Sequence, residues 1–196
     1  MGVKEQMVAI LKSNETSRIN FNFAATSIGF PDTGRTHRID GGAFRNVAAR
    51  IAEGYLKIVE GEFPMDNRMV YAASDDPVEA YEANTFYLGN NDRQSRDFAG
   101  LVVHESVHAH FDLEQVKIPW VDNEAAAYIA QAYYLRNSGY NAARIPAASP
   151  LGLGLKAIGN MRKKIDASEI IEDIRNSLRN NPNYHSNINT NFFGDG

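Results

Sequence analysis

Two histidines four residues apart, with a glutamate directly after the first, are the residues of this sequence best suited to do chemistry. They are His104, Glu105 and His108, within the stretch LVVHESVHAHF at 101–111. On a helix, residues four apart lie on one face, with their β-carbons about 5–6 Å apart. Both imidazoles can then reach one metal ion at the ~2.0–2.1 Å of a zinc–nitrogen bond. The spacing therefore predicts a metal site, with Zn²⁺ as its ion.

Glu105 is predicted to act on water rather than to bind the metal. It lies about 100° around the helix from His104 and borders the face that carries both histidines. A carboxylate there can take a proton from a water whose pKa the metal lowers. The stretch is mostly apolar, which predicts a partly buried helix whose ionisable groups need compensation. The alternative is an amphipathic helix with two surface histidines, and it leaves this apolar setting unexplained.

A catalytic zinc needs a third protein ligand and leaves its fourth position to water. The chain has no cysteine, and the leading candidate is Glu124, in the stretch VDNEAAAYIAQAYYL. The residues between His108 and Glu124 include Pro119, so the chain can reverse there. Three alanines at 125–127 would permit a close approach of the two helices. The metal-free alternative for Glu124 is a first-turn charge behind an N-cap at Asp122.

Three other side chains near the motif are weaker candidates for the third ligand. Glu114 stands six residues after His108, where one class of zinc peptidases has a histidine. That class needs a glycine where this chain has Phe111. His110 lies about 200° around the helix from His108 and points off the metal face. Asp112 lies one turn beyond His108, better placed as a partner of a ligand than as a ligand.

The HESVH helix at 104–108, followed by NEAAA at 123–127, resembles the zincin metallopeptidases, and within them the gluzincin branch. The resemblance covers residues 80–136. The pairing of a HESVHA helix with an NEAAAY helix also resembles a pattern found in many bacterial proteins. The sequence departs from the gluzincin pattern in three ways: the spacing to the second motif is short, no methionine turn is visible, and Tyr128 stands where an aspartate often orients a histidine.

The resemblance implies a zinc-dependent metallopeptidase acting on a peptide or protein substrate. Its metal ligands would be His104, His108 and Glu124, and its general base would be Glu105. The strand expected at 83–88 would be the edge strand that pairs with extended substrate. The alternative is a catalytically inactive zinc-binding domain of zincin shape that serves in interactions.

Zincins commonly stabilise the developing oxyanion with a tyrosine or histidine donor. Aromatic residues at helical spacing belong more often to the core than to a site, so no single residue stands out for this role. The candidates in this chain are Tyr128, Tyr133, Tyr134, Tyr140 and His185. His37 lies in a glycine-rich stretch and is predicted to be a polar loop residue.

The elements that must position these residues follow from hydrophobic spacing and turn residues. They predict an α+β fold in which a small mixed or antiparallel sheet accompanies a dominant set of helices, including a zincin-like active-site helix. Helices are expected at 2–13, 44–59, 96–112, 122–137, 156–164 and 167–179. Strands are expected at 17–26, 68–73 and 83–88, and loops at 29–42 and 141–154. Either Asn91 or Ser95 could cap the motif helix.

Length and composition favour one globular domain. The chain has 196 residues, of which 43% are hydrophobic, and a net charge of −4. This predicts a single domain over residues 1–180 and a flexible tail over 181–196. The absence of a basic block argues against nucleic acid as a partner. No apolar run is long enough for a membrane span and none resembles a signal peptide, which leaves cytoplasmic and secreted locations, and the oligomeric state, open.

Overall fold

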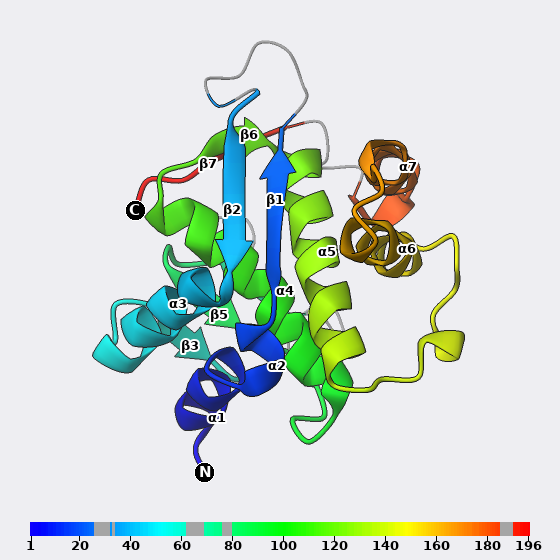
Figure 1. Cartoon of the computed structure of the whole chain (residues 1–196). Coiled ribbons are helices and arrows are strands. Elements are labelled where there is room, and N and C mark those ends of the chain that lie inside the picture. The colour runs from blue at the N-terminus through cyan, green and yellow to red at the C-terminus, as the bar shows by residue number, and fades with distance from the viewer. Residues whose placement is uncertain (26–31, 33, 62–68, 76–79, 185–189) are drawn as a thin grey trace.

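The fold is α+β, as the sequence predicts, and helices make up most of it. The computed structural model describes residues 1–25, 32, 34–61, 69–75, 80–184 and 190–196. Within these residues the strands form three small, separate sheets around a core of packed helices. Figure 1 shows the helices α4 (Arg96–Leu113) and α5 (Trp120–Asn137) in the middle of the molecule, where they pack against each other.

The other helices lie around this central pair, and the longer of them bury apolar side chains in one core with it. They are α1 (Val3–Leu11), α2 (Asn14–Ser17), α3 (Gly41–Glu53), η1 (Ala142–Arg144), α6 (Pro150–Arg162), α7 (Ser168–Arg179) and η2 (Pro182–Tyr184). Core residues from α1 and α7, such as Met7 and Ile174, belong to the same buried cluster. The two ends of the chain therefore contribute to one core.

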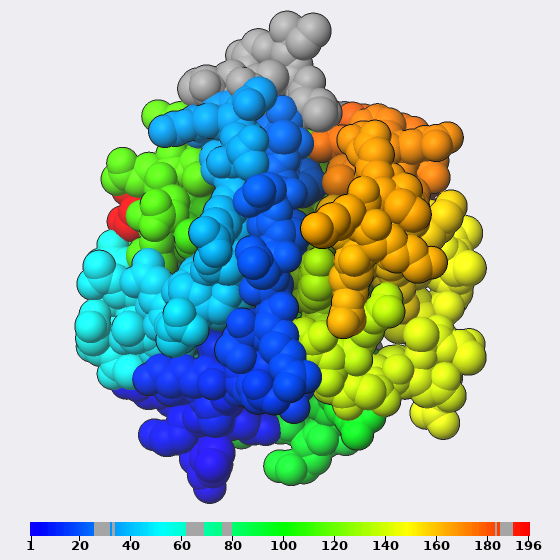
Figure 2. Space-filling model, viewed as in Figure 1, coloured from blue at the N-terminus to red at the C-terminus, as the bar shows by residue number. Residues whose placement is uncertain are grey.

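The strands are short, and some pair with strands far along the chain. They are β1 (Asn20–Ala24), β2 (Thr36–Asp40), β3 (Lys57–Val59), β4 (Val70–Ala72), β5 (Thr85–Tyr87), β6 (Lys117–Pro119) and β7 (Asn191–Phe193). β1 pairs with β2, and β6 with β7, both antiparallel. In the space-filling view, the β1–β2 pair runs down the visible face between α3 on one side and α6 and α7 on the other (Figure 2).

The strand expected to be an edge strand is the central strand of its sheet. β5 pairs in parallel with β3 and antiparallel with β4, so the order is β3-β5-β4. The strand that contacts α4 at the edge is β4. The prediction for 83–88 was therefore right about the strand and wrong about its place, because strand order depends on pairings that local sequence does not encode.

The helix that carries the motif begins as expected. The hydroxyl of Ser95 accepts a hydrogen bond from the Phe98 amide at 3.0 Å, so Ser95 and not Asn91 is the N-cap. The predicted close approach of α5 is also present, since its alanines at 125–127 are completely buried. On the α4 side the close contact comes at Gly100, where a β-carbon would lie 3.2 Å from Leu135 of α5. Small residues on both helices thus bring their axes together.

Two predictions for the first third of the chain need correction. The helix expected at 44–59 ends earlier, because Gly54 adopts a left-handed conformation (φ 82°) and the chain continues into the strand Lys57–Val59. The loop expected at 29–42 contains β2 and the start of α3, capped by Asp40. The glycines and the proline there suggested a loop, but the alternating residues that follow form a strand.

Two further boundaries differ from those predicted. α5 begins at Trp120, so Asp122 is not its N-cap and lies instead inside the first turn. There its carboxylate receives a hydrogen bond of 2.6 Å from the buried Arg175 of α7. α6 begins at Pro150, within the loop expected at 141–154, because proline is well tolerated in the first turn of a helix.

The segment 181–196, expected to be a flexible tail, contributes η2 and β7 to the fold. Phe192 of β7 stacks on Trp120 with ring centroids 5.5 Å apart. The Asp195 amide donates to the Asp112 carboxylate of α4 at 3.0 Å. Asparagine-rich composition suggested disorder, whereas the buried Phe192 and the strand partner β6 anchor the part of the segment that the structure describes. His185 lies outside the described residues.

Among the described residues, none of the helices has the length and apolarity that a membrane span requires.

Candidate metal centre

The three residues predicted as metal ligands lie together. His104, His108 and Glu124 are buried, and each offers a ligand atom within 4.8 Å of those of the other two. The Nε2 atoms of His104 and His108 are each 3.4 Å from a different oxygen of Glu124. Two helices provide this arrangement: α4 presents both histidines on one face, and the first turns of α5 bring the glutamate to that face. The three side chains can hold a metal ion.

Hydrogen bonds from α5 fix which nitrogen of each ring is free. His104 Nδ1 lies 3.2 Å from Oε1 of Gln131, and His108 Nδ1 lies 2.8 Å from Oδ1 of Asn123. Because an amide oxygen only accepts, each Nδ1 carries the proton. Each neutral ring then keeps its lone pair on Nε2, which is the atom that faces Glu124. An outer partner that fixes the tautomer in this way is a common feature of metal-binding histidines.

Glu124 has an incomplete set of partners. Its Oε2 atom is fully buried and has no hydrogen-bond partner among the described residues. His104 Nε2 is the nearby nitrogen, at 3.4 Å. A buried carboxylate oxygen without a hydrogen bond is costly unless a cation satisfies it. The residues present therefore fit a metal ion with two nitrogen ligands and one carboxylate ligand, a set that zinc binds well.

The charges within the site are strongly coupled. Burial opposes the ionisation of Glu124, but His104 and His108 outweigh it and lower the pKa of its carboxyl group. Burial likewise opposes protonation of His104, but the adjacent Glu124 outweighs it and raises the pKa of this ring. Burial dominates at His108 and lowers its pKa to about 4. The pKa values of these three groups thus depend on one another, because Glu124 lies beside both rings.

Glu105 borders the ligands without joining them. Its Oε2 atom lies 3.9 Å from His108 Nε2 and accepts a hydrogen bond of 2.9 Å from the Tyr71 backbone amide. That amide belongs to the edge strand β4. Burial raises the pKa of Glu105 to about 8, and the nearby Glu124 contributes to the increase. The strand therefore holds one carboxylate oxygen of Glu105 in place.

Asp112, expected as a partner of a metal ligand, has a different role. Its carboxylate accepts a hydrogen bond of 2.6 Å from the hydroxyl of Tyr71 and another from the Asp195 amide. It contacts neither histidine ligand through any hydrogen bond in the described residues. Asp112 thus ties β4 and the C-terminal segment to α4, and it reaches the site only through the strand that holds Glu105.

The tyrosines predicted as oxyanion donors are spread over the molecule. Tyr128 is near the site, with its ring edge-on to His104 at 4.6 Å between centroids. Tyr133 stacks on Phe21 in the core. Tyr134 lies near Glu15 and Arg96, and Tyr140 near Asp97 and Arg144, away from the metal ligands.

The sequence analysis missed Tyr184, which lies close to Tyr128. The two hydroxyl oxygens are 2.5 Å apart. The pKa of Tyr184 is raised by burial first and by the negative charges of Glu124 and Glu105, which places its hydroxyl near both carboxylates. No motif surrounds Tyr184, and its position in an asparagine-rich segment gave no signal.

Gln131 and Asn123 were also missed as the partners of the histidines. Both lie on α5, and Gln131 is seven residues after Glu124, which is two helical turns and therefore the same face. Tyr128, four residues after Glu124, occupies the position where the gluzincin pattern often has an aspartate that orients a histidine. The helical spacing of Glu124 and Gln131 was the signal that could have identified Gln131 as the partner of His104.

No family model matches the chain, and neither the curated proteins nor the solved structures include a match to it.

Proposed function

We propose that this protein is a zinc-dependent hydrolase, a metallopeptidase that cleaves a peptide bond. The observation that carries the proposal is the cluster of His104, His108 and Glu124, with Glu105 beside the ligands but held by a backbone amide. Three protein ligands leave room for water at a tetrahedral ion, which distinguishes catalytic zinc sites from closed structural ones. The buried helix α4 and the strand β4 lie next to this cluster.

Zinc in this site would polarise a carbonyl oxygen and make water more acidic. Glu105 takes a proton from the attacking water, using the carboxylate oxygen that does not bind the Tyr71 amide. A base with a pKa near neutrality suits this step, and a neighbouring cation lets Glu105 ionise at a lower pH than it does alone. Once protonated, Glu105 can pass the proton to the departing amine.

Two tyrosines at the site have complementary roles in this proposal. Tyr184 donates a hydrogen bond to the substrate carbonyl oxygen as negative charge develops there. Tyr128 positions it through the contact between the two hydroxyl groups. Burial and the adjacent carboxylates keep the Tyr184 hydroxyl protonated, because both raise its pKa. A protonated hydroxyl is the form that can donate.

The side chains of the site are almost completely buried. His104, Glu105 and Glu124 are 5–6% exposed, whereas His108 is 2% exposed. This burial keeps the electrostatic interactions within the site strong, because they are weakly screened.

The test is to compare zinc-loaded wild-type protein with Glu105→Gln on a mixture of unstructured peptides, reading new termini by mass spectrometry. The substitution keeps the size of the side chain and removes the base. We expect cleavage to fall by about 10²–10⁴-fold, while zinc stoichiometry stays unchanged. Glu114→Gln, a matched change on the opposite side of α4, should retain wild-type cleavage.

Two results would count against the mechanism in different ways. Wild-type cleavage by Glu105→Gln would remove Glu105 from the role of base. Zinc binding without cleavage of any peptide by the wild-type protein would favour the non-catalytic zinc-binding domain instead.

A further inference from the structure

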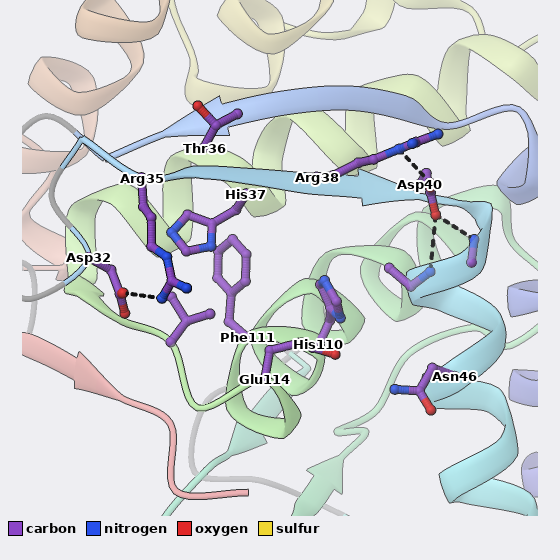
Figure 3. A pocket seen from close by; sticks show the side chains of 13 residues that line it. Asp32, Arg35, Thr36, His37, Arg38, Asp40, Asn46, His110, Phe111 and Glu114 are labelled. Carbon is purple, nitrogen blue, oxygen red and sulfur yellow. Dashed lines mark hydrogen bonds and ion pairs between the residues drawn. The ribbon is translucent and has the colours of Figure 1, made fainter.

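A second pair of histidines lines a cavity on the other side of α4. The cavity has a volume of about 460 Å³ and lies between β2, the start of α3 and the end of α4. His37 reaches it from β2 and His110 from α4, with Phe111 next to both rings (Figure 3). His110 follows His108 by two residues, so its side chain leaves the helix about 200° around from that of His108. The cavity is therefore separate from the candidate metal centre.

Both histidines place a buried nitrogen there without a hydrogen bond. These atoms are Nε2 of His37 and Nδ1 of His110, and neither has a partner among the described residues. The backbone of Arg38 hydrogen-bonds the His110 ring. Because Nδ1 lacks a partner, this bond involves Nε2, and Nδ1 of the neutral ring carries a lone pair. Buried polar atoms are rarely left unpaired, so these two nitrogens suggest a ligand that would satisfy them.

Glu114 supplies a carboxylate near the histidines. It lies four residues after His110, on the same face of the helix end, and it is the charged group with the strongest effect on the His110 ring. Glu114 is exposed and has no ion-pair partner in the described part of the chain. Its side chain is thus free to turn toward the cavity.

The other charged groups of the cavity already have partners. Arg35 pairs with Asp32 at 2.8 Å, and Arg38 pairs with Asp40 at 2.8 Å. Asp40 also accepts hydrogen bonds from the first amides of α3. With both guanidinium groups engaged, the cavity offers no free cation to bind an anion. The groups that remain are two imidazole nitrogens and one carboxylate.

We propose that this cavity is a second site for a divalent transition-metal ion, bound by His37, His110 and Glu114. Imidazole with carboxylate is the donor set of zinc, nickel and copper rather than of calcium or magnesium, which prefer oxygen alone. The three ligand atoms are not gathered within 4.8 Å as those of the first centre are. Binding therefore requires the three side chains to move toward one another, and the site is weaker than the first.

A bound ion here would join the strand β2 to the end of α4. A ligand that binds only the folded state raises its stability with ligand concentration. We expect Zn²⁺ beyond one equivalent to raise the Tm of the wild-type protein. This effect does not depend on whether the first centre is catalytic.

The experiment starts from full-length protein that carries one equivalent of zinc and titrates it with further ZnCl₂ by calorimetry. We expect a second, weaker equivalent in the wild-type protein. His37→Gln and His110→Gln should each abolish it and retain the first equivalent. His37 is the sharper variant, because it lies on β2 and leaves the helix of the first centre unchanged.

A matched control separates this site from casual binding to histidine. The chain has five histidines, and His185 is the one assigned to neither centre. His185→Gln should keep the second equivalent. The proposal is overturned if the wild-type protein binds no second equivalent, if that equivalent persists in both cavity variants, or if His185→Gln removes it.

Discussion

The two sides of helix α4 carry the same kind of residue in different settings. On one side His104 and His108 are almost completely buried, and amides of α5 fix the unused nitrogen of each ring. On the other side His37 and His110 are half-buried, and each has a nitrogen with no partner. The comparison indicates that a histidine pair is preorganised to bind a metal when outer partners orient both rings and a carboxylate lies beside them. Helical spacing alone does not achieve this.

Substitution of the glutamate on each side of α4 should give the largest difference in zinc affinity at the first centre. Glu124→Ala removes the carboxylate that faces both Nε2 atoms, so we expect zinc affinity at the first centre to fall by more than the ~10–100-fold that loss of an outer partner costs. Equilibrium dialysis against a zinc buffer measures this. Glu114→Ala makes the same change of charge on the opposite side and should leave the first centre intact. Equal losses in the two variants would show that the sides are not independent.

The outer partners should have the next largest effect. Gln131→Leu and Asn123→Leu each remove the acceptor that holds one Nδ1 proton, so the ring can rotate or change tautomer. We expect each to weaken zinc binding by about 10–100-fold. Asn137→Leu, which removes an amide from the same helix away from the site, is the control. Unchanged affinity in both site variants would mean that packing alone orients the rings.

The sequence predicted those features of the two sides of α4 that depend on residues close together in the chain. The motif helix was predicted, with Ser95 as one of two candidate caps, and so was the meeting of His104, His108 and Glu124, because two histidines and a glutamate at fixed spacing report on one helix face. The prediction of α5 depended on three alanines and a proline that lie within this helix or next to it in the sequence. The role of Tyr184 was not predictable, since it depends on where η2 packs, roughly sixty residues from its nearest site partner, Tyr128.

The cavity on the other side was invisible in the sequence for a similar reason. His37 was predicted to be a loop residue because the glycines before it hid the strand β2. His110 was excluded as a ligand because it points away from the motif face, and that exclusion is correct for the first centre. Only the pairing of β1 with β2 and the packing of α4 bring the two rings to one cavity.

A smaller effect concerns the support of Glu105. Tyr71→Phe removes the hydroxyl that donates to the buried Asp112, and we expect a loss of about 1–3 kcal/mol in the free energy of unfolding, measured by urea denaturation. Zinc affinity should not change, because the Tyr71 amide still binds Glu105. Tyr55→Phe, at an exposed ring, should change stability by less than about 0.5 kcal/mol. Similar losses in the two variants would contradict the assigned role of the hydroxyl.

The most direct test of the central claim is a crystal structure of the protein loaded with one equivalent of zinc, with data collected at the zinc absorption edge. The account predicts one dominant anomalous peak, about 2.0–2.2 Å from Nε2 of His104, Nε2 of His108 and a carboxylate oxygen of Glu124. A dominant peak elsewhere, or no peak at these three side chains, would contradict it.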